Sequence, residues 1–199
     1  MRTSDIPTCI VDALSISATQ GGLTDADYHL AGAGRAIAFV RMSAEALDSL
    51  NNDQRVAEYH AYCGISAART AIDATASWLR LELEVDIKSL SYVDLKKDAY
   101  REKILGKRPD LGESVEPLSQ LASEIDQHRQ RAQHREGLAL IFHSPGTVVV
   151  HAGGWYLAPD GLSRPRSGDI HLVDMLQLWA TNIENRICWL LDSLGTTSC

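Results

Sequence analysis

Apolar residues recur at spacings of three and four in four long segments of the chain, as they do on one face of an α-helix. Thr24 or Asp25 can cap the first of these helices, and Asn51-Asn52-Asp53 forms a turn and a new cap before the second. Gly137 can end the third helix or bend it. The expected helices span about residues 25–50, 54–85, 114–137 and 169–194.

The segments that flank and join these helices lack the helical spacing. Residues 1–24 carry no clear period and are expected to form an irregular N-terminal arm, and residues 195–199 form a tail. Residues 86–112 are mixed, with a charged stretch at 96–105 that suits a short surface helix. We therefore expect a loop and short-helix insertion between the second and third long helices.

A second insertion is expected at residues 138–168, where the composition changes. The runs 147–151 and 155–157 are rich in β-branched and aromatic residues, and Gly153-Gly154 lies between them. Two such runs separated by glycine are typical of a β-hairpin. Trp155 and Tyr156 on this hairpin are expected to serve local packing, with base stacking as the alternative.

Long helices that each carry one apolar stripe bury those stripes most simply in a bundle. We predict a mostly α fold, in which residues 25–194 form a four-helix bundle with a small β-hairpin insertion between the third and fourth long helices. The fourth helix has apolar residues on more than one side, which predicts a homodimer through the third and fourth helices. These residues are Trp179, Ile187, Trp189, Leu190 and Leu191.

Composition narrows the class of protein. The chain has 199 residues and a net charge of −7 at pH 7, which argues against general nucleic-acid coating but allows a local basic site. The four cysteines contain no Cys-x-x-Cys pair, so we expect free thiols in a reducing compartment. Neither a signal peptide nor a membrane-spanning apolar run is recognised, and a cytoplasmic protein is expected.

A basic stretch near the end of the third helix is the strongest candidate for chemistry. Residues 129–135 hold three arginines and a histidine within an acidic chain. Arg129 offers a fixed cation that can hold a phosphate, and His134 offers an imidazole that can move a proton near neutral pH. Together they suit the cleavage of a phosphodiester without a metal, and the plainer interpretation is a solvated, charged helix end.

A four-helix bundle with Arg-x4-His late in its third long helix resembles the HEPN superfamily (higher eukaryotes and prokaryotes nucleotide-binding). The resemblance covers about residues 25–194, with Arg129 as the motif arginine and His134 as the motif histidine. Gln130 stands where the family often has asparagine. The resemblance implies a metal-independent endoribonuclease or an inactive relative that binds RNA or nucleotide. It also implies a toxin or defence setting, a homodimer, and an antitoxin or regulatory protein as partner.

Helix geometry separates the two motif residues. Residues five apart on a helix point about 140° apart, so Arg129 lies beside the apolar stripe and His134 faces away from it. A cleft at a dimer interface, or a bend before Gly137, can bring both to one substrate. Attack by the 2′-hydroxyl is then expected, with His134 as general acid or base and Arg129 stabilising the phosphorane charge.

The remaining residues around the motif are expected to support RNA binding. Arg131, Arg135 and Gln130 are candidate phosphate or RNA ligands. Asp73, inside the apolar middle of the second helix, is expected either to lie beside Arg129 or to point into water.

Two other functions were weighed from the same residues. Glu124 and His128 lie one turn apart and could share a metal ion, but the other long helices offer no matching ligand motif. We therefore expect neither a metal nor any other cofactor. The alternative function is a non-enzymatic interaction module, in which the basic patch at 129–135 docks an acidic partner.

Overall fold

The computed structural model describes residues 5–50, 53–86, 93–134, 140–142, 155–157 and 170–196, apart from the side chains of 131–134, 141–142 and 156. The described part is mostly helical, and this confirms the predicted class. Its α-helices are α1 (Thr8–Gln20), α2 (Asp25–Ser49), α3 (Gln54–Glu82), α4 (Asp98–Lys107), α5 (Gly112–His134) and α6 (Leu172–Leu194).

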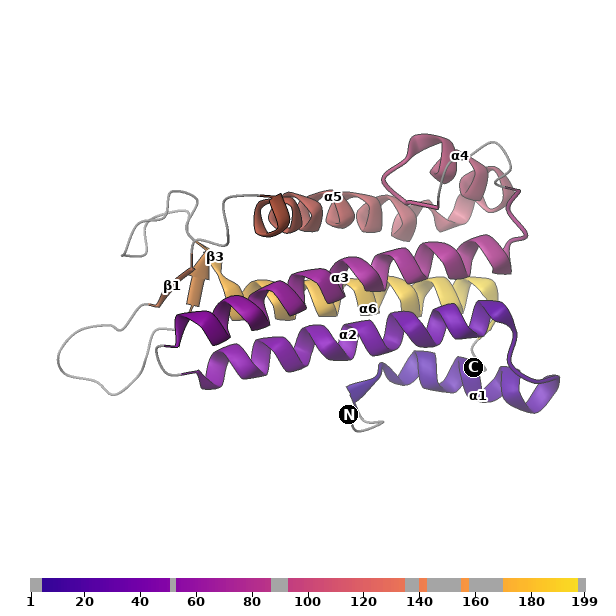
Figure 1. Ribbon diagram of the computed structural model, residues 1–199. Helices are drawn as coiled ribbons and strands as arrows, with labels where there is room; N and C mark the ends of the chain where they lie inside the picture. The colour runs from indigo at the N-terminus through magenta and orange to yellow at the C-terminus, as the bar shows by residue number, and fades with distance from the viewer. Residues whose placement is uncertain are drawn as a thin grey trace.

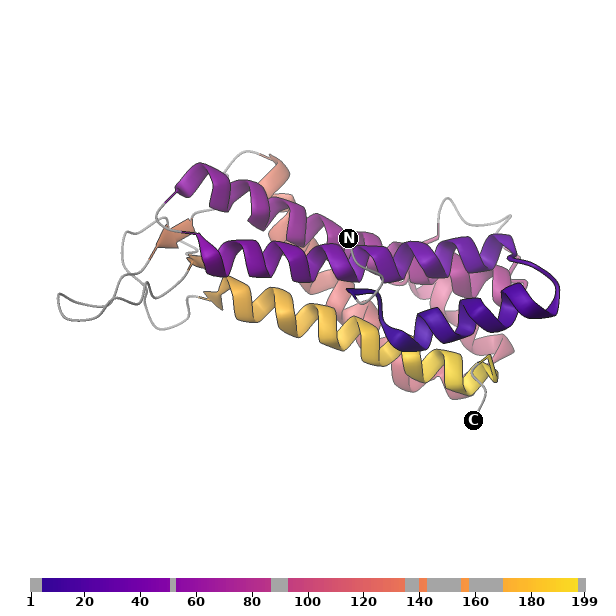
Figure 2. The same cartoon turned by 90° about the horizontal axis from the view of Figure 1, so that it is seen from below.

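The long helices pack lengthwise against one another (Figures 1 and 2). The helix α2 contacts α3 along its length and also packs against α6, while α5 contacts both α3 and α6. The core between them is built from alanine, leucine, isoleucine and valine, with Trp78 and Trp179 among its largest fully buried side chains. The short helix α4 lies at one end of the bundle, beside the start of α5 (Figure 1).

Local signals explain where α2 and α3 begin and where α6 ends. Thr24 and Asp27 form a capping box at the start of α2, because each side chain binds the backbone N–H of the other. The carboxylate of Asp53 accepts the first free N–H groups of α3. Gly195 ends α6 in the left-handed conformation, with φ 72°. The expected helix at 25–50 is confirmed closely, and the other three are confirmed with ends shifted by a few residues.

The third long helix begins earlier than expected. Its start was predicted near residue 114, but α5 begins at Gly112. Pro117 therefore lies inside the helix, where it cannot donate the intrahelical hydrogen bond to the carbonyl oxygen of Glu113. A short 3₁₀ helix at Pro109–Leu111 precedes α5, and the buried Leu111 anchors this turn.

The prediction of an irregular N-terminal arm is wrong, because residues Thr8–Gln20 form α1. This helix packs against α2 and α6, where Ile10 and Ala13 are buried (Figure 2). Gly34 on α2 permits the close approach, since an added Cβ would lie 2.8 Å from Cγ2 of Ile6. The Ser17 hydroxyl also donates to Asp27 at 3.0 Å. Tertiary contacts with α2, rather than a strong helical period of its own, therefore stabilise α1.

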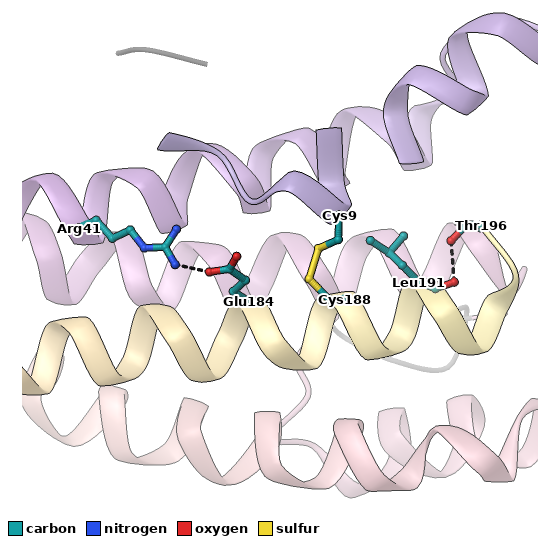
Figure 3. Close-up of a disulfide and its surroundings, with 6 residues drawn as sticks. All are labelled: Cys9, Arg41, Glu184, Cys188, Leu191 and Thr196. Atoms are coloured by element: carbon teal, nitrogen blue, oxygen red, sulfur yellow. Dashed lines mark hydrogen bonds and ion pairs between the residues drawn. A yellow bond between two sulfur atoms is a disulfide. The ribbon is translucent and has the colours of Figure 1, made fainter. Parts of the chain in front are cut away.

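The prediction that all cysteines are free thiols is also wrong. Cys9 on α1 and Cys188 on α6 form a disulfide across 179 residues of sequence (Figure 3). Cys63 is a free thiol, and Cys199 lies outside the described residues. The pairing depends on α1 packing beside α6, which no local spacing reveals. The reducing compartment and cytoplasmic location expected from free thiols thus lose that support and remain predictions.

Three short strands form an antiparallel sheet in the order β1 (Leu140–Phe142), β2 (Trp155–Leu157), β3 (Ile170–His171). The predicted strand at 155–157 is confirmed, and Trp155 is buried, as local packing requires. Its predicted partner at 147–151 lies outside the described residues. The described partners of β2 are β1 and β3. Because Ile170 and His171 pair with β2, α6 begins at Leu172 rather than at 169.

The five apolar residues that were expected to lie on more than one side of the fourth helix pack within this chain, although Leu178 on α6 is exposed. Trp179, Ile187, Leu190 and Leu191 are buried within this chain, and Trp189 packs partly buried against the core. The helices α1, α2, α3 and α5 together surround α6 on more sides than a simple bundle would. Within the described part of the chain, no helix has both the length and the apolar character needed to cross a membrane.

Candidate functional site

Arg129 lies one turn beyond Ile125, the last apolar residue of α5 that is buried among the described side chains. The stripe of Leu118, Ala122 and Ile125 packs α5 into the bundle and brings Arg129 towards α3. The Arg129 side chain is 34% exposed, and its Nε lies 3.2 Å from Oδ1 of Asp126. Among the described residues this is the only ion pair that Arg129 makes. The guanidinium is therefore held at one nitrogen and remains partly open to solvent.

Asp126 is a buried carboxylate that is shared by three cations. It is only 4% exposed, and its Oδ2 forms an ion pair with Nζ of Lys96. Its Oδ1 faces Nε of Arg129 and, at 3.6 Å, Nε of Arg69. A buried carboxylate is costly unless it is paired, and here the cations of three separate elements pair it.

Arg69 on α3 joins the other carboxylates to this group. Its side chain is 6% exposed, and Nη2 lies 2.8 Å from Asp73 and 3.0 Å from Asp94. Asp94 belongs to the segment between α3 and α4, and its Oδ1 also accepts the backbone N–H of Lys96 at 3.0 Å. We call Arg69, Asp73, Asp94, Lys96, Asp126 and Arg129 the Asp126 cluster.

The Asp126 cluster has balanced charge, with three cations and three carboxylates. Burial alone would raise the pKa of Asp94, but hydrogen bonds from the Lys96 backbone and the Arg69 guanidinium hold that pKa below its ordinary value. Asp73 behaves in the opposite way. Burial raises its pKa, and the positive charges of Arg69 and Arg129 offset only part of that rise.

The structure describes the side chains of Arg129, Gln130 and Asp73 but not those of the other predicted site residues. Asp73 shares the cluster with Arg129, but its ion pair is with Arg69, one turn earlier on α3. Gln130 is exposed on α5. Arg131 and His134 belong to α5, but their side chains lie outside the description, as does the whole of Arg135. The pairing of Arg129 with His134 therefore stays a prediction.

Glu124 and His128, the pair weighed as metal ligands, both contact Trp179 on α6. Glu124 accepts a hydrogen bond from the indole Nε1 at 2.9 Å, and the His128 ring lies 5.6 Å from the indole ring. These contacts join α5 to α6. Across the part of the chain that the structure describes, no group of three or more His, Cys, Asp or Glu side chains is placed to hold a metal ion.

Sequence reasoning missed Arg69, Asp94, Lys96 and Asp126. Part of the signal was present, because Arg69 and Asp73 are four apart and Asp126 and Arg129 three apart on helices. Asp94 and Lys96, by contrast, lie in a connection without helical spacing. Only the packing of that connection against α3 and α5 reveals their part in the cluster.

Comparisons with protein-family models, with curated proteins and with solved structures found no match to this chain. A proposal for its function therefore depends on its own residues and on the resemblance of its motif.

Proposed function

We propose that the chain is a HEPN-like, metal-independent endoribonuclease in which Arg129 binds a phosphate of RNA. The observation that carries this proposal is that the Arg129 side chain is paired at one nitrogen but still partly exposed to solvent. Its Nε lies 3.2 Å from a buried carboxylate as an ion pair, while a third of the side chain stays exposed. An arginine held in this way loses little conformational freedom when it binds, which favours tight phosphate recognition.

The charge of Arg129 is only partly compensated. Asp126 is its partner, but Asp126 also pairs with Lys96 and Arg69. The terminal nitrogens of Arg129 make no ion pair with any other described residue. They are suited to donate two parallel hydrogen bonds to phosphate oxygens, the geometry that makes arginine effective at such sites.

The proposed reaction is transesterification within RNA. His134 accepts the proton of a 2′-hydroxyl, whose oxygen forms a bond to the adjacent phosphorus. The bond from phosphorus to the 5′-oxygen breaks, that oxygen takes up a proton, and a 2′,3′-cyclic phosphate and a 5′-hydroxyl result. Arg129 stabilises the negative charge of the phosphorane. Arg131, Arg135 and Gln130 bind neighbouring phosphates or the ribose.

A homodimer belongs to this proposal, since two copies of the motif can then meet at one cleft. The described exposed apolar residues of α2 and α3 can extend its surface beyond the motif on α5. Phe39 and Met42 on α2, and Tyr59 and Tyr62 on α3, are each at least 40% exposed. Light scattering should give twice the chain mass, and Phe39→Ser with Tyr59→Ser should lower it. A monomer mass at every concentration would contradict the dimer.

Cleavage of a labelled single-stranded RNA tests the proposed reaction. The wild-type chain should cleave it in excess chelator and leave cyclic phosphate ends. Arg129→Ala and His134→Ala should each lower the rate by about 10²–10⁴-fold with the fold intact. Arg108→Ala is the matched control, because Arg108 pairs with Asp110 away from the cluster. Full activity in His134→Ala, or activity that the chelator abolishes, would contradict the mechanism.

The second candidate is a non-enzymatic module that docks an acidic partner through residues 129–135. The balanced charge of the Asp126 cluster is compatible with it, because Arg129 can then serve to join α3 to α5 while Arg131 and Arg135 bind the partner. This candidate predicts no RNA cleavage by the wild type. It also predicts binding of an acidic partner that weakens with salt and with loss of Arg131 or Arg135.

A further inference from the structure

Lys96 occupies the oxygen of Asp126 that Arg129 would need for a bidentate ion pair. A guanidinium and a carboxylate commonly pair through two parallel hydrogen bonds, which use both carboxylate oxygens. In this structure Nζ of Lys96 pairs with Oδ2, and Nε of Arg129 lies 3.2 Å from Oδ1. Arg129 is therefore confined to a one-point contact with Asp126.

The backbone around Lys96 is held in place by buried neighbours. Leu95 is 1% exposed in the core, and Asp94 is anchored by the hydrogen bond from Arg69. Asp94 in turn accepts the backbone N–H of Lys96 through its side chain and that of Lys97 through its carbonyl. The Lys96 side chain itself is 27% exposed. The backbone at residues 94–97 is thus held in place, and it positions the ammonium group of Lys96 beside Asp126.

We propose that Lys96 is a positioning residue that keeps the terminal nitrogens of Arg129 available to phosphate by competing with Arg129 for Asp126. Its consequence for RNA binding rests on the proposed function. Its consequence for the Arg129–Asp126 contact does not. Without Lys96, Oδ2 of Asp126 becomes open to Arg129, whose Nε already lies beside Oδ1, and the guanidinium closes onto the carboxylate.

Hydrogen exchange at the Nε–H of Arg129, followed by ¹⁵N NMR, tests the contact directly. Lys96→Met keeps the aliphatic stem and should slow this exchange several-fold, because Arg129 pairs more tightly. Asp126→Asn should speed it. Lys96→Arg restores a cation at Oδ2 and should return the exchange towards the wild-type rate. Lys103→Met is the matched control, since Lys103 binds the backbone oxygen of Asp86 instead. Equal exchange in the wild type and Lys96→Met would overturn the proposal.

Binding of a labelled single-stranded oligonucleotide with 2′-O-methyl groups, which cannot be cleaved, tests the consequence for RNA. Lys96→Met should weaken binding about fivefold in the wild-type background. It should have no further effect in an Arg129→Ala background, because it acts through Arg129. An equal loss in both backgrounds would mean that Lys96 contacts RNA itself, which would overturn the positioning role, as would unchanged binding in Lys96→Met.

The two measurements separate this proposal from the proposed function. If the wild type binds no RNA but Lys96→Met still slows exchange at Arg129, the positioning role is supported and the ribonuclease is overturned. If the wild type binds RNA and exchange is unchanged in Lys96→Met, the positioning role fails while RNA binding, which the proposed function requires, is supported.

Discussion

Nη1 of Arg186 on α6 donates a hydrogen bond to the carbonyl oxygen of Glu113 on α5 at 3.0 Å. This is the carbonyl that Pro117 leaves without an intrahelical donor. The guanidinium of one helix thus completes the hydrogen bonding of its neighbour and ties the first turns of α5 to α6.

This relationship predicts coupling between Arg186 and Pro117. Arg186→Met should lower the free energy of unfolding by about 1 kcal/mol in the wild-type background. The same substitution should lower the free energy of unfolding by less in a Pro117→Ala background, because the alanine restores the N–H that can bind the carbonyl oxygen of Glu113. Urea unfolding of the four proteins in this double-mutant cycle measures the difference. Purely additive effects would show that the two residues act independently.

The disulfide between Cys9 and Cys188 predicts a redox-dependent stability. It closes a loop of 179 residues, so breaking it greatly increases the conformational entropy of the unfolded chain. Reduction, or Cys9→Ser, should lower the free energy of unfolding by about 2–4 kcal/mol. Cys63→Ser is the control. Because Cys63 is a free thiol, the oxidised variant should have the same free energy of unfolding as the oxidised wild type. A thiol titration that finds no additional free thiols after reduction would contradict the disulfide.

At Gly64, the helix α3 packs closely against both α2 and α6. An added Cβ would lie 2.8 Å from Cδ1 of the buried Leu176 and 3.1 Å from Cβ of Ser43. Gly64→Ala should therefore destabilise the protein by about 1–3 kcal/mol through overpacking, despite the higher helix propensity of alanine. Gly106→Ala on α4 meets open space and should not destabilise it. Thermal unfolding compares the two, and equal effects would contradict the close packing.

The lowered pKa of Asp94 predicts that the protein loses stability at acidic pH. Its pKa is lowered in the folded state, so its contribution is fully present above the unfolded pKa of about 3.9. That contribution is lost as the pH falls below this value, through the folded pKa. Asp94→Asn should lower stability at neutral pH and flatten the loss that the wild type shows below about pH 4. Asp98→Asn, at an exposed carboxylate, serves as control, and parallel pH profiles for wild type and Asp94→Asn would refute the assignment.

The sequence allowed the long helices to be predicted because each has a sustained apolar stripe and most have a local start or stop signal. The capping box of Thr24 and Asp27 and the left-handed Gly195 are examples. The helix α1 has only a short stripe, in which Ile10 and Ala13 are buried, and its stability depends on the space left by Gly34. Contacts of that kind carry no periodic signal, and the same holds for the disulfide across the fold.

The candidate site was predictable only where charges share a helix. The basic stretch that begins at Arg129, and Asp73 in an apolar setting, stand out in the sequence. The sharing of Asp126 among Arg129, Arg69 and Lys96 depends on how α5 and the segment after α3 pack against α3. Tertiary packing therefore decides how far the charge of Arg129 is compensated, and with it how well Arg129 binds an anion.

The central claim is that Arg129 contacts a phosphate of RNA, and the salt dependence of binding tests it most directly. Fluorescence anisotropy with a 2′-O-methyl oligonucleotide gives the association constant between about 50 and 200 mM salt. For Arg129→Ala we predict weaker binding and a plot of log K against log[salt] whose slope is shallower by about 0.7, the value for one phosphate contact on a single strand. Equal affinity and equal slope in the wild type and Arg129→Ala would contradict the claim.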